Sequence, residues 1–381
     1  IANYIRIPRE YNTSPLRPKA QFKVADSYYN MESFDQSIKA YQELAEKYPT
    51  DELADDALYS IAQAYEQQGK SAEAISAYRT LLRTFPNSDL CADVQLELGN
   101  YNSTKKNHAQ AIAEYQAVID NYPNSSAAAL AQYNIGISYK ALGSYPQAIS
   151  AFDKVIAKYP QDPSASKSAF EIGQCWRTKS NPNRNLQNAI SAYDRVVKDY
   201  SQSVEAGRAL FSIGKVDEEL SDWQKAIDSY EKLSSKYPEN EYLQEAYISR
   251  GLALHQLKKY REAIGIYDQI LDNPKTYKKD ISVRAQYYKG DSLYELGQYE
   301  KAAEAYLRVP LVYSEPDLDV YALSRAGDSY EKVNKSKEAI TWYKKILKDY
   351  ADPGGKYYKQ KKADWNDAIE FARKRLKQIG E

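Results

Sequence analysis

Apolar residues recur three and four positions apart in two short segments between Ala128 and Pro160, a spacing that lays one apolar stripe along a helix. Gly143 separates the two segments, and Pro160 follows the last turn of the second, where a proline cannot continue a helix. The stretch therefore predicts a hairpin of two amphipathic helices. Such a hairpin is too small to bury its own apolar face, so it needs copies of itself on either side.

The copies follow one another in a single register. A small residue marks the middle of each predicted first helix, at Ala25, Ala62, Gly99, Gly136, Gly173, Gly214, Gly251, Gly290 and Gly327, mostly 37 residues apart. In each second helix a small residue is followed, four positions on, by an aromatic one. These aromatics are Tyr41, Tyr78, Tyr115, Phe152, Tyr193, Tyr230, Tyr267, Tyr306 and Tyr343. We expect the small residues to permit close helix approach and the aromatic to fill the space toward the next hairpin.

This order of small residue, aromatic and closing proline resembles the tetratricopeptide repeat, and the resemblance covers almost the whole chain. It implies an all-α, right-handed α-solenoid of about nine helix hairpins at residues 16–350, followed by a linker and a capping helix at 351–381. The usual repeat of that family has about 34 residues, whereas most units here have 37. Endings such as Tyr122-Pro123-Asn124-Ser125 resemble, more narrowly, bacterial envelope proteins of the outer-membrane assembly lipoprotein and Tol–Pal types. On that narrower resemblance we expect a periplasmic or cell-envelope location, with the cytoplasm as the alternative.

Three segments depart from the regular units. Residues 1–11 align with residues 303–313, so we expect residues 1–12 to be part of the second helix of an upstream repeat, with any signal peptide or lipid anchor before it. The fifth unit inserts four residues around Ser180–Asn185, and the stretch 273–280 carries two extra residues. Both insertions are expected to be loops.

The charge balance argues against several classes of function. With 52 basic and 52 acidic residues the formal net charge is zero, whereas a general nucleic-acid or anionic-membrane binder needs a positive field. No apolar run approaches the roughly 18 residues of a membrane span. Tyrosine is the outlier of the composition, with 37 Tyr against 7 Phe.

Residues for catalysis are scarce. The two histidines and two cysteines lack zinc-ligand spacing, and the sequence contains neither a phosphate-binding glycine loop nor a nucleophile elbow. We interpret His108 as a packing residue, His255 as exposed, and Cys175 as a small buried residue rather than a reactive thiol. We expect no enzymatic activity, no cofactor and no metal.

In the tetratricopeptide family the first helices line a concave groove, and the resemblance implies that positions flanking each central small residue point into it. Tyrosine and arginine often anchor interfaces, and they cluster in the eighth and ninth units. The candidate partner-binding residues there are Arg284, Tyr288, Asp291, Tyr294 and Arg325, and those in the fourth and fifth units are Asn134, Lys140 and Arg177.

Two further groups are weighed against simpler interpretations. Asn100, Asn134 and Lys140 partly match a clamp for a C-terminal carboxylate, but Glu97 lies among them and would repel one. The basic run Lys356–Lys362 is interpreted as a solvated linker, with binding of membrane headgroups or of an acidic partner as the alternative.

These observations predict a non-enzymatic scaffold or adaptor that binds a protein or extended peptide through its concave surface. Two alternatives stay open. One is a structural subunit of a larger multiprotein assembly, bound through a tyrosine-rich outer face or the N-terminal end. The other is a helical-repeat RNA binder, against which the neutral charge and the variable groove residues count.

Overall fold

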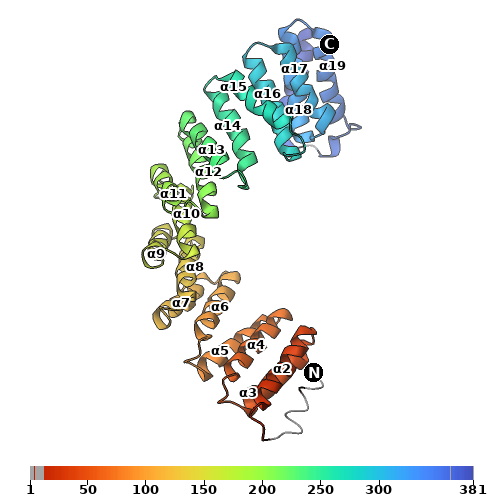
Figure 1. Ribbon diagram of the computed structural model, residues 1–381. Coiled ribbons are helices and arrows are strands. Elements are labelled where there is room, and N and C mark those ends of the chain that lie inside the picture. The colour runs from red at the N-terminus through yellow and green to blue at the C-terminus, as the bar shows by residue number, and fades with distance from the viewer. Residues whose placement is uncertain (1–3, 5–12, 361, 381) are drawn as a thin grey trace. The chain divides into compact units, whose positions relative to one another are not determined.

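The computed structural model describes residues 4, 13–360 and 362–380, and within them every regular element is helical (Figure 1). The chain divides into two compact units, residues 1–185 (unit 1) and 186–381 (unit 2). The predicted all-α solenoid of helix hairpins is confirmed. The partial helix predicted at residues 1–12 lies outside the described residues, apart from Tyr4.

The described part of unit 1 consists of four helix hairpins and the first helix of a fifth hairpin, whose second helix belongs to unit 2. They are α2 (Arg17–Asn30), α3 (Phe34–Lys47), α4 (Ala54–Gln67), α5 (Ser71–Thr84), α6 (Cys91–Thr104), α7 (His108–Asn121), α8 (Ala127–Ala141), α9 (Tyr145–Lys158) and α10 (Pro163–Arg177).

Unit 2 continues the alternation and ends in short turns and a last helix. Its α-helices are α11 (Leu186–Asp199), α12 (Val204–Glu219), α13 (Trp223–Lys236), α14 (Leu243–Gln256), α15 (Tyr260–Leu271), α16 (Lys279–Glu295), α17 (Tyr299–Arg308), α18 (Pro316–Lys332), α19 (Ser336–Ile346) and α20 (Asn366–Ile379). Two π-helical segments, η1 (Val309–Tyr313) and η2 (Leu347–Ala351), extend α17 and α19, and two 3₁₀ turns, η3 (Tyr358–Gln360) and η4 (Ala363–Trp365), precede α20.

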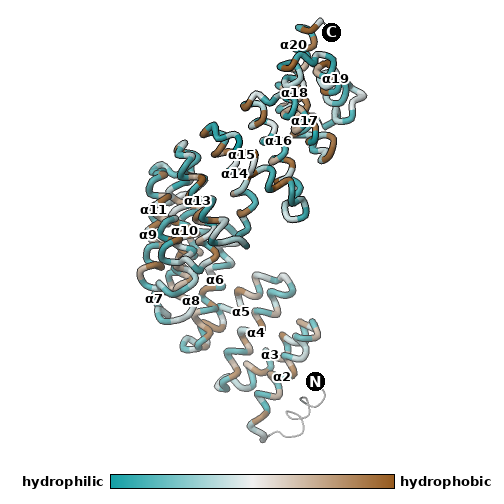
Figure 2. Tube along the Cα trace, turned by 45° about the horizontal axis from the view of Figure 1, so that its top comes forward, coloured by the Kyte–Doolittle hydropathy of each residue, from teal (hydrophilic) through white to brown (hydrophobic). Residues whose placement is uncertain are grey.

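Within each unit, every helix packs on the next one along the chain, and successive first helices also touch, as α6 does α8 and α14 does α16. We call the side formed by the first helices of a unit the first-helix face. Hydrophobic and hydrophilic positions alternate along the helices (Figure 2), which is expected when one side of each helix packs and the other meets water. In unit 2, α20 closes the array against α18 and α19.

The aromatic of each second helix has a specific neighbour. As expected, it reaches the next hairpin: the centre of the Tyr267 ring lies 6.2 Å from that of Tyr288, and the Tyr306 hydroxyl accepts from Arg325. Where the central residue is a glycine, the same ring also lies over the glycine of its own hairpin. A Cβ atom at Gly290 would lie 2.6 Å from Cε1 of Tyr306, and one at Gly214 would lie 2.5 Å from Cε1 of Tyr230. In these hairpins the ring occupies the space that a side chain at the glycine would need.

The turn after the first helix is also repeated. Seven residues beyond the central small residue, the backbone adopts a left-handed conformation with φ between 57° and 73° at Glu32, Gly69, Lys106, Gly143, Ser221, Lys258, Gly297 and Asn334. The fifth hairpin is the exception, because its four-residue insertion replaces this turn. The insertion is a loop, as predicted, and it folds back on α10: Asn181 Nδ2 donates to the Cys175 carbonyl at 2.8 Å.

Candidate functional site

The five candidate residues of the eighth and ninth helix hairpins lie on the first-helix face of unit 2, the compact half of the chain formed by residues 186–381. Arg284, Tyr288, Asp291 and Tyr294 recur at helical spacing along α16, and Arg325 projects from α18. We call these five residues the tyrosine–arginine patch. The Arg325 guanidinium carbon lies 4.4 Å from the centre of the Tyr294 ring, which joins the two helices by a cation–π contact.

Arg325 is held from several sides at once. Its Nη2 lies 3.5 Å from Asp291 Oδ1, its Nη1 lies 4.0 Å from Asp328 Oδ2, and its Nε donates to the Tyr306 hydroxyl at 3.3 Å. The Tyr294 hydroxyl donates to Asp328 Oδ2 at 2.6 Å. The Arg325 side chain nevertheless remains 34% exposed. The guanidinium is thus fixed in one place while part of it still faces solvent.

Burial and hydrogen bonding oppose each other at Asp291. Burial raises the pKa of its carboxyl, and the hydrogen bond from Tyr306 and the charge of Arg325 offset part of that rise. Toward the other end of α16, Arg284 Nη2 binds Glu245 Oε1 of α14 at 2.6 Å and Asp280 Oδ2 at 3.6 Å. Carboxylates therefore accompany both arginines of the patch.

The hydroxyl of the second-helix tyrosine has a recurring partner. It donates to an oxygen of a side chain on the preceding first helix, one or four positions beyond the central small residue. The pairs are Tyr41–Asp26, Tyr115–Asn100, Tyr230–Glu218, Tyr306–Asp291 and Tyr343–Glu331, with oxygen–oxygen distances of 2.6 to 2.9 Å. Several positions that the resemblance assigns to a ligand therefore also anchor the second helix of their own hairpin.

Two of the remaining hairpins lack this pairing for different reasons. Where the partner positions are Ile137 and Lys140, the aromatic is Phe152, which has no hydroxyl. Where they are Leu252 and His255, the aromatic is still tyrosine. The buried hydroxyl of Tyr267 has no hydrogen-bond partner among the described residues.

The second group of candidates, in unit 1, is engaged by neighbouring side chains. Lys140 Nζ lies 2.6 Å from Glu171 Oε2, and Asn134 Nδ2 donates to Asn100 Oδ1 at 3.3 Å. Arg177, at the end of α10, accepts a hydrogen bond from Arg184 Nε at its carbonyl, at 2.8 Å. Two of the three residues that partly match a carboxylate clamp therefore already have partners as donors, Asn134 with Asn100 and Lys140 with Glu171.

The remaining predictions for single residues have mixed outcomes. His255 is not exposed: it is half-buried, its Nδ1 lies 3.0 Å from Ser292 Oγ, and its ring packs on Tyr260 with centroids 5.0 Å apart. His108 is half-buried at the start of α7. Cys175 is fully buried, as predicted, and burial raises the pKa of its thiol to about 12. Both cysteines are free thiols.

The basic run near the C-terminus makes specific contacts with the rest of unit 2. Lys356 Nζ lies 4.7 Å from the centre of the Tyr357 ring, and that ring packs on Tyr350 at 4.9 Å. Lys362 pairs with Asp317 Oδ2 at 2.5 Å, and Lys361 lies outside the described residues. Lys356, Lys359 and Lys362 are exposed, as a solvated linker predicts, but Tyr357 is half-buried and attaches the run to unit 2.

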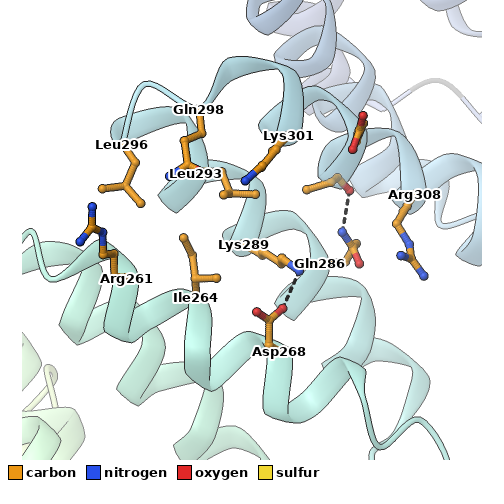
Figure 3. Close-up of a pocket in the computed structure, with 12 residues that line it drawn as sticks. Arg261, Ile264, Asp268, Gln286, Lys289, Leu293, Leu296, Gln298, Lys301 and Arg308 are labelled. Atoms are coloured by element: carbon orange, nitrogen blue, oxygen red, sulfur yellow. Dashed lines mark hydrogen bonds and ion pairs between the residues drawn. The ribbon is translucent and has the colours of Figure 1, made fainter.

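The sequence interpretation missed a hollow on the other side of α16. It has a volume of about 500 Å³ and lies between α15 and α17, over α16 (Figure 3). Its distinctive lining residues are Arg261, Ile264, Leu293, Leu296, Lys301 and Arg308. The signal in the sequence is the set of cations at Arg261, Lys301 and Arg308, positions of the second helices that are mostly uncharged or acidic in the neighbouring hairpins.

Two general searches of the described residues bear on function. They contain no group of three or more His, Cys, Asp or Glu side chains placed to hold a metal ion. Over the same residues, no helix combines the length and the apolar character that crossing a membrane requires.

Profiles of the tetratricopeptide repeat match most of the chain. One matches residues 22–89, 70–126, 96–163, 133–203, 278–316 and 289–356, which together make up well over half of the sequence, and a second matches residues 208–240. A search of curated proteins gave no match.

Many solved structures are similar to the chain. A tetratricopeptide repeat protein from Parabacteroides merdae is 13% identical, with 71% of this chain and 98% of that protein covered and a TM-score of 0.42. PilW, a type IV pilus biogenesis factor, is 18% identical over 61% of this chain and 99% of its own, with a TM-score of 0.41. YrrB, a TPR protein with an unusual peptide-binding site, is 17% identical over 60% and 99%, with a TM-score of 0.42. At these TM-scores the family assignment depends on the repeat profiles.

Proposed function

The chain belongs to the tetratricopeptide repeat family, and from this premise we propose that it is a non-enzymatic scaffold that binds an extended segment of another protein on the first-helix face of unit 2. The observation that carries the proposal is the partly exposed Arg325, held between Tyr294 and Asp291. Aromatic and arginine side chains anchor protein interfaces. A guanidinium already fixed in place loses less conformational entropy on binding than a free one.

The charges beside Arg325 restrict the chemistry of the bound segment. Asp291 and Asp328 flank the guanidinium, and Glu245 pairs with Arg284. An acidic segment or a C-terminal carboxylate would be repelled by these groups. We therefore expect a neutral or basic segment whose backbone carbonyls accept from Arg325 and whose side chains pack on the rings of Tyr288 and Tyr294.

Peptide selection tests the proposal. A display library of random peptides is panned on the whole chain, and the selected peptides are labelled and titrated by fluorescence polarisation. The double variant Arg284→Glu, Tyr294→Ala should weaken binding at least about tenfold, since removing an anchoring aromatic or arginine commonly costs that much affinity. Circular dichroism of the variant checks that the helices are retained.

A matched control lies on the opposite side of α16. Lys301 is exposed on α17, away from the patch, so Lys301→Glu should change the affinity of a patch-binding peptide less than about twofold. If no peptide is selected, or if the selected peptides respond to Lys301→Glu and not to the patch variant, the first-helix face is not the site.

We also propose that the protein acts in a bacterial cell envelope. The support is the 37-residue spacing of most units together with their Tyr-Pro endings. Sequencing of the gene upstream of Ile1 and fractionation of the source cells test this location. An upstream region without an export signal, together with recovery in the cytoplasmic fraction, would refute it.

A further inference from the structure

We propose a second binding site, independent of the first-helix face: the hollow between α15 and α17 takes an acidic segment of a partner protein that carries an apolar residue between its carboxylates. Lys289, Leu293 and Leu296 recur along α16 at helical spacing and line this hollow. At 3.6 residues per turn they lie on the side of α16 opposite the tyrosine–arginine patch. One helix therefore contributes to two sites of different chemistry.

The floor of the groove is apolar at the end nearest Arg261. Ile264 of α15 and Leu296 at the end of α16 are half-buried, and Leu293 between them is buried. Figure 3 shows Arg261 and Leu296 at one end of the hollow and Arg308 at the other. An apolar side chain placed over this floor would cover surface that now meets water, which favours binding.

The rim of the groove carries three cations and one exposed carboxylate, Glu304. Arg261, Lys301 and Arg308 are exposed, and none of them is paired with a carboxylate of the described residues. Lys289, deeper in the groove, is paired with Asp268 at 2.5 Å. An incoming carboxylate can therefore meet the three rim cations without breaking an existing ion pair.

The spacing of the rim suits a short segment. Lys301 and Arg308 are seven residues apart on α17, about 10 Å along a helix axis. Arg261 faces them from α15. Carboxylates on either side of one apolar residue can reach cations at this spacing while the apolar side chain covers the floor.

The basic rim is not a general property of the repeats. In the neighbouring groove between α13 and α15 and in the one between α17 and α19, the positions equivalent to Arg261, Lys301 and Arg308 are uncharged or acidic, with one exception. They are Gln224, Glu262 and Gln269 in the first groove and Glu300, Glu338 and Lys345 in the second. The exception, Lys345, is already paired with Asp349 at 2.7 Å. Three unpaired cations around an apolar floor therefore distinguish this groove from both of its neighbours.

A peptide fits the groove better than another polyanion does. Asp268 and Glu304 also line it, and they would repel a continuous phosphate backbone. The three apolar residues of the floor match an aliphatic side chain, which a nucleic acid lacks. Nucleic acid and anionic membrane therefore become outcomes of the test.

The test uses the whole chain and a fluorescein-labelled probe peptide in which Asp and Glu flank a central Leu. At low salt the probe should bind saturably, and the double variant Lys301→Glu, Arg308→Glu should weaken it at least about tenfold. Replacing the central Leu of the probe by Ser should weaken it about tenfold as well, because the apolar contact is lost. The Tyr294→Ala variant should bind the probe as the wild type does, which separates this site from the first-helix face.

A matched control tests a general charge effect. Lys232 occupies the position of Arg308 on α13 and is equally exposed, so Lys232→Glu should change probe affinity less than about twofold. A probe in which Lys and Arg replace the acids should bind the double variant better than the wild type, which also shows that the variant is folded.

Three results would overturn the proposal. The first is the absence of saturable binding by the acidic probe. The second is equal loss of affinity in Lys232→Glu and in the double variant. The third is binding of single-stranded DNA or anionic vesicles that depends on Lys301 and Arg308 and exceeds that of the probe, since the groove would then be a surface for polyanions.

Discussion

Tyr306 and Tyr267 occupy equivalent positions, so the same change, removal of a tyrosine hydroxyl, can be made and compared at both. Both rings are fully buried at the same position of adjacent hairpins, and each covers the central glycine of its own hairpin. The Tyr306 hydroxyl donates to Asp291 Oδ1 at 2.6 Å, whereas the Tyr267 hydroxyl has no partner among the described residues. Tyr306→Phe and Tyr267→Phe should therefore affect stability in opposite directions.

The size of each effect follows from these contacts. A hydrogen bond to a charged group contributes about 1.5–3 kcal/mol, so we expect Tyr306→Phe to destabilise unit 2 by about 2 kcal/mol. A buried hydroxyl without a partner costs about 1–3 kcal/mol, so Tyr267→Phe should be neutral or stabilise by about 1 kcal/mol. The two variants should differ by about 2–3 kcal/mol although the chemical change is the same.

Local opening is the appropriate measurement, because a repeat array need not unfold in a single step. Hydrogen exchange with mass spectrometry on peptides from α16–α17 and from α14–α15 gives the opening free energy of each hairpin. Burial raises the pKa of Asp291, and the hydrogen bond from Tyr306 offsets part of that rise. The loss in Tyr306→Phe should therefore shrink at acidic pH, because protonation of Asp291 removes the charge that strengthens this hydrogen bond.

The reasoning would be refuted by equal losses in the two variants. A cost of about 2 kcal/mol for Tyr267→Phe would mean that its hydroxyl has a partner, such as a bound water. A neutral Tyr306→Phe would mean that the contact with Asp291 contributes nothing to stability.

Three further predictions follow from single positions. Gly290→Ala should destabilise the protein by about 1–3 kcal/mol, because its Cβ would lie 2.6 Å from the Tyr306 ring. Gly265→Ala, whose Cβ would have no neighbour within 4 Å, should stabilise the protein by about 0.5–1 kcal/mol. Urea unfolding followed by circular dichroism compares the two variants. Burial raises the pKa of Asp217 to about 6, so the carboxyl favours folding below its unfolded pKa, and this advantage, up to about 3 kcal/mol, is lost as pH rises through 6. The stability of the wild type relative to Asp217→Asn should therefore fall between about pH 4 and pH 7, and a pH-independent difference would contradict this. Lys258→Gly should stabilise by up to about 1 kcal/mol because φ is 61° there; a lower melting temperature would argue against that backbone conformation.

The periodicity of the sequence was sufficient for the fold because each hairpin repeats the same contacts. Gly143 was expected to end its helix, and the structure shows the left-handed backbone at that position and at its equivalents. The prediction that the second-helix aromatic faces the next hairpin omitted its contact with the glycine of its own hairpin, because spacing alone does not say which side of a ring meets a glycine. Only coordinates show the ring of Tyr306 over Gly290.

The candidate site was less accessible to sequence reasoning. The resemblance could place Asp291 and Arg325 on one face, and the structure brings them together. It could not show that Asp291 also binds the hydroxyl of its own hairpin, because that contact depends on side-chain reach. His255 was expected to be exposed for the same reason: its partner Ser292 is 37 residues away in sequence.

The closure of a ring over a glycine takes place inside one hairpin, and this determines which pieces of the chain can be exchanged. Gly290 and Tyr306 belong to the same pair of helices. A copied segment that runs from a first helix through its own second helix therefore contains both partners of the glycine–ring contact. A segment that starts in a second helix and ends in the next first helix separates the partners of two such contacts. Growth or shortening of the array by whole hairpins therefore preserves its internal fit, and new binding chemistry can be introduced one hairpin at a time.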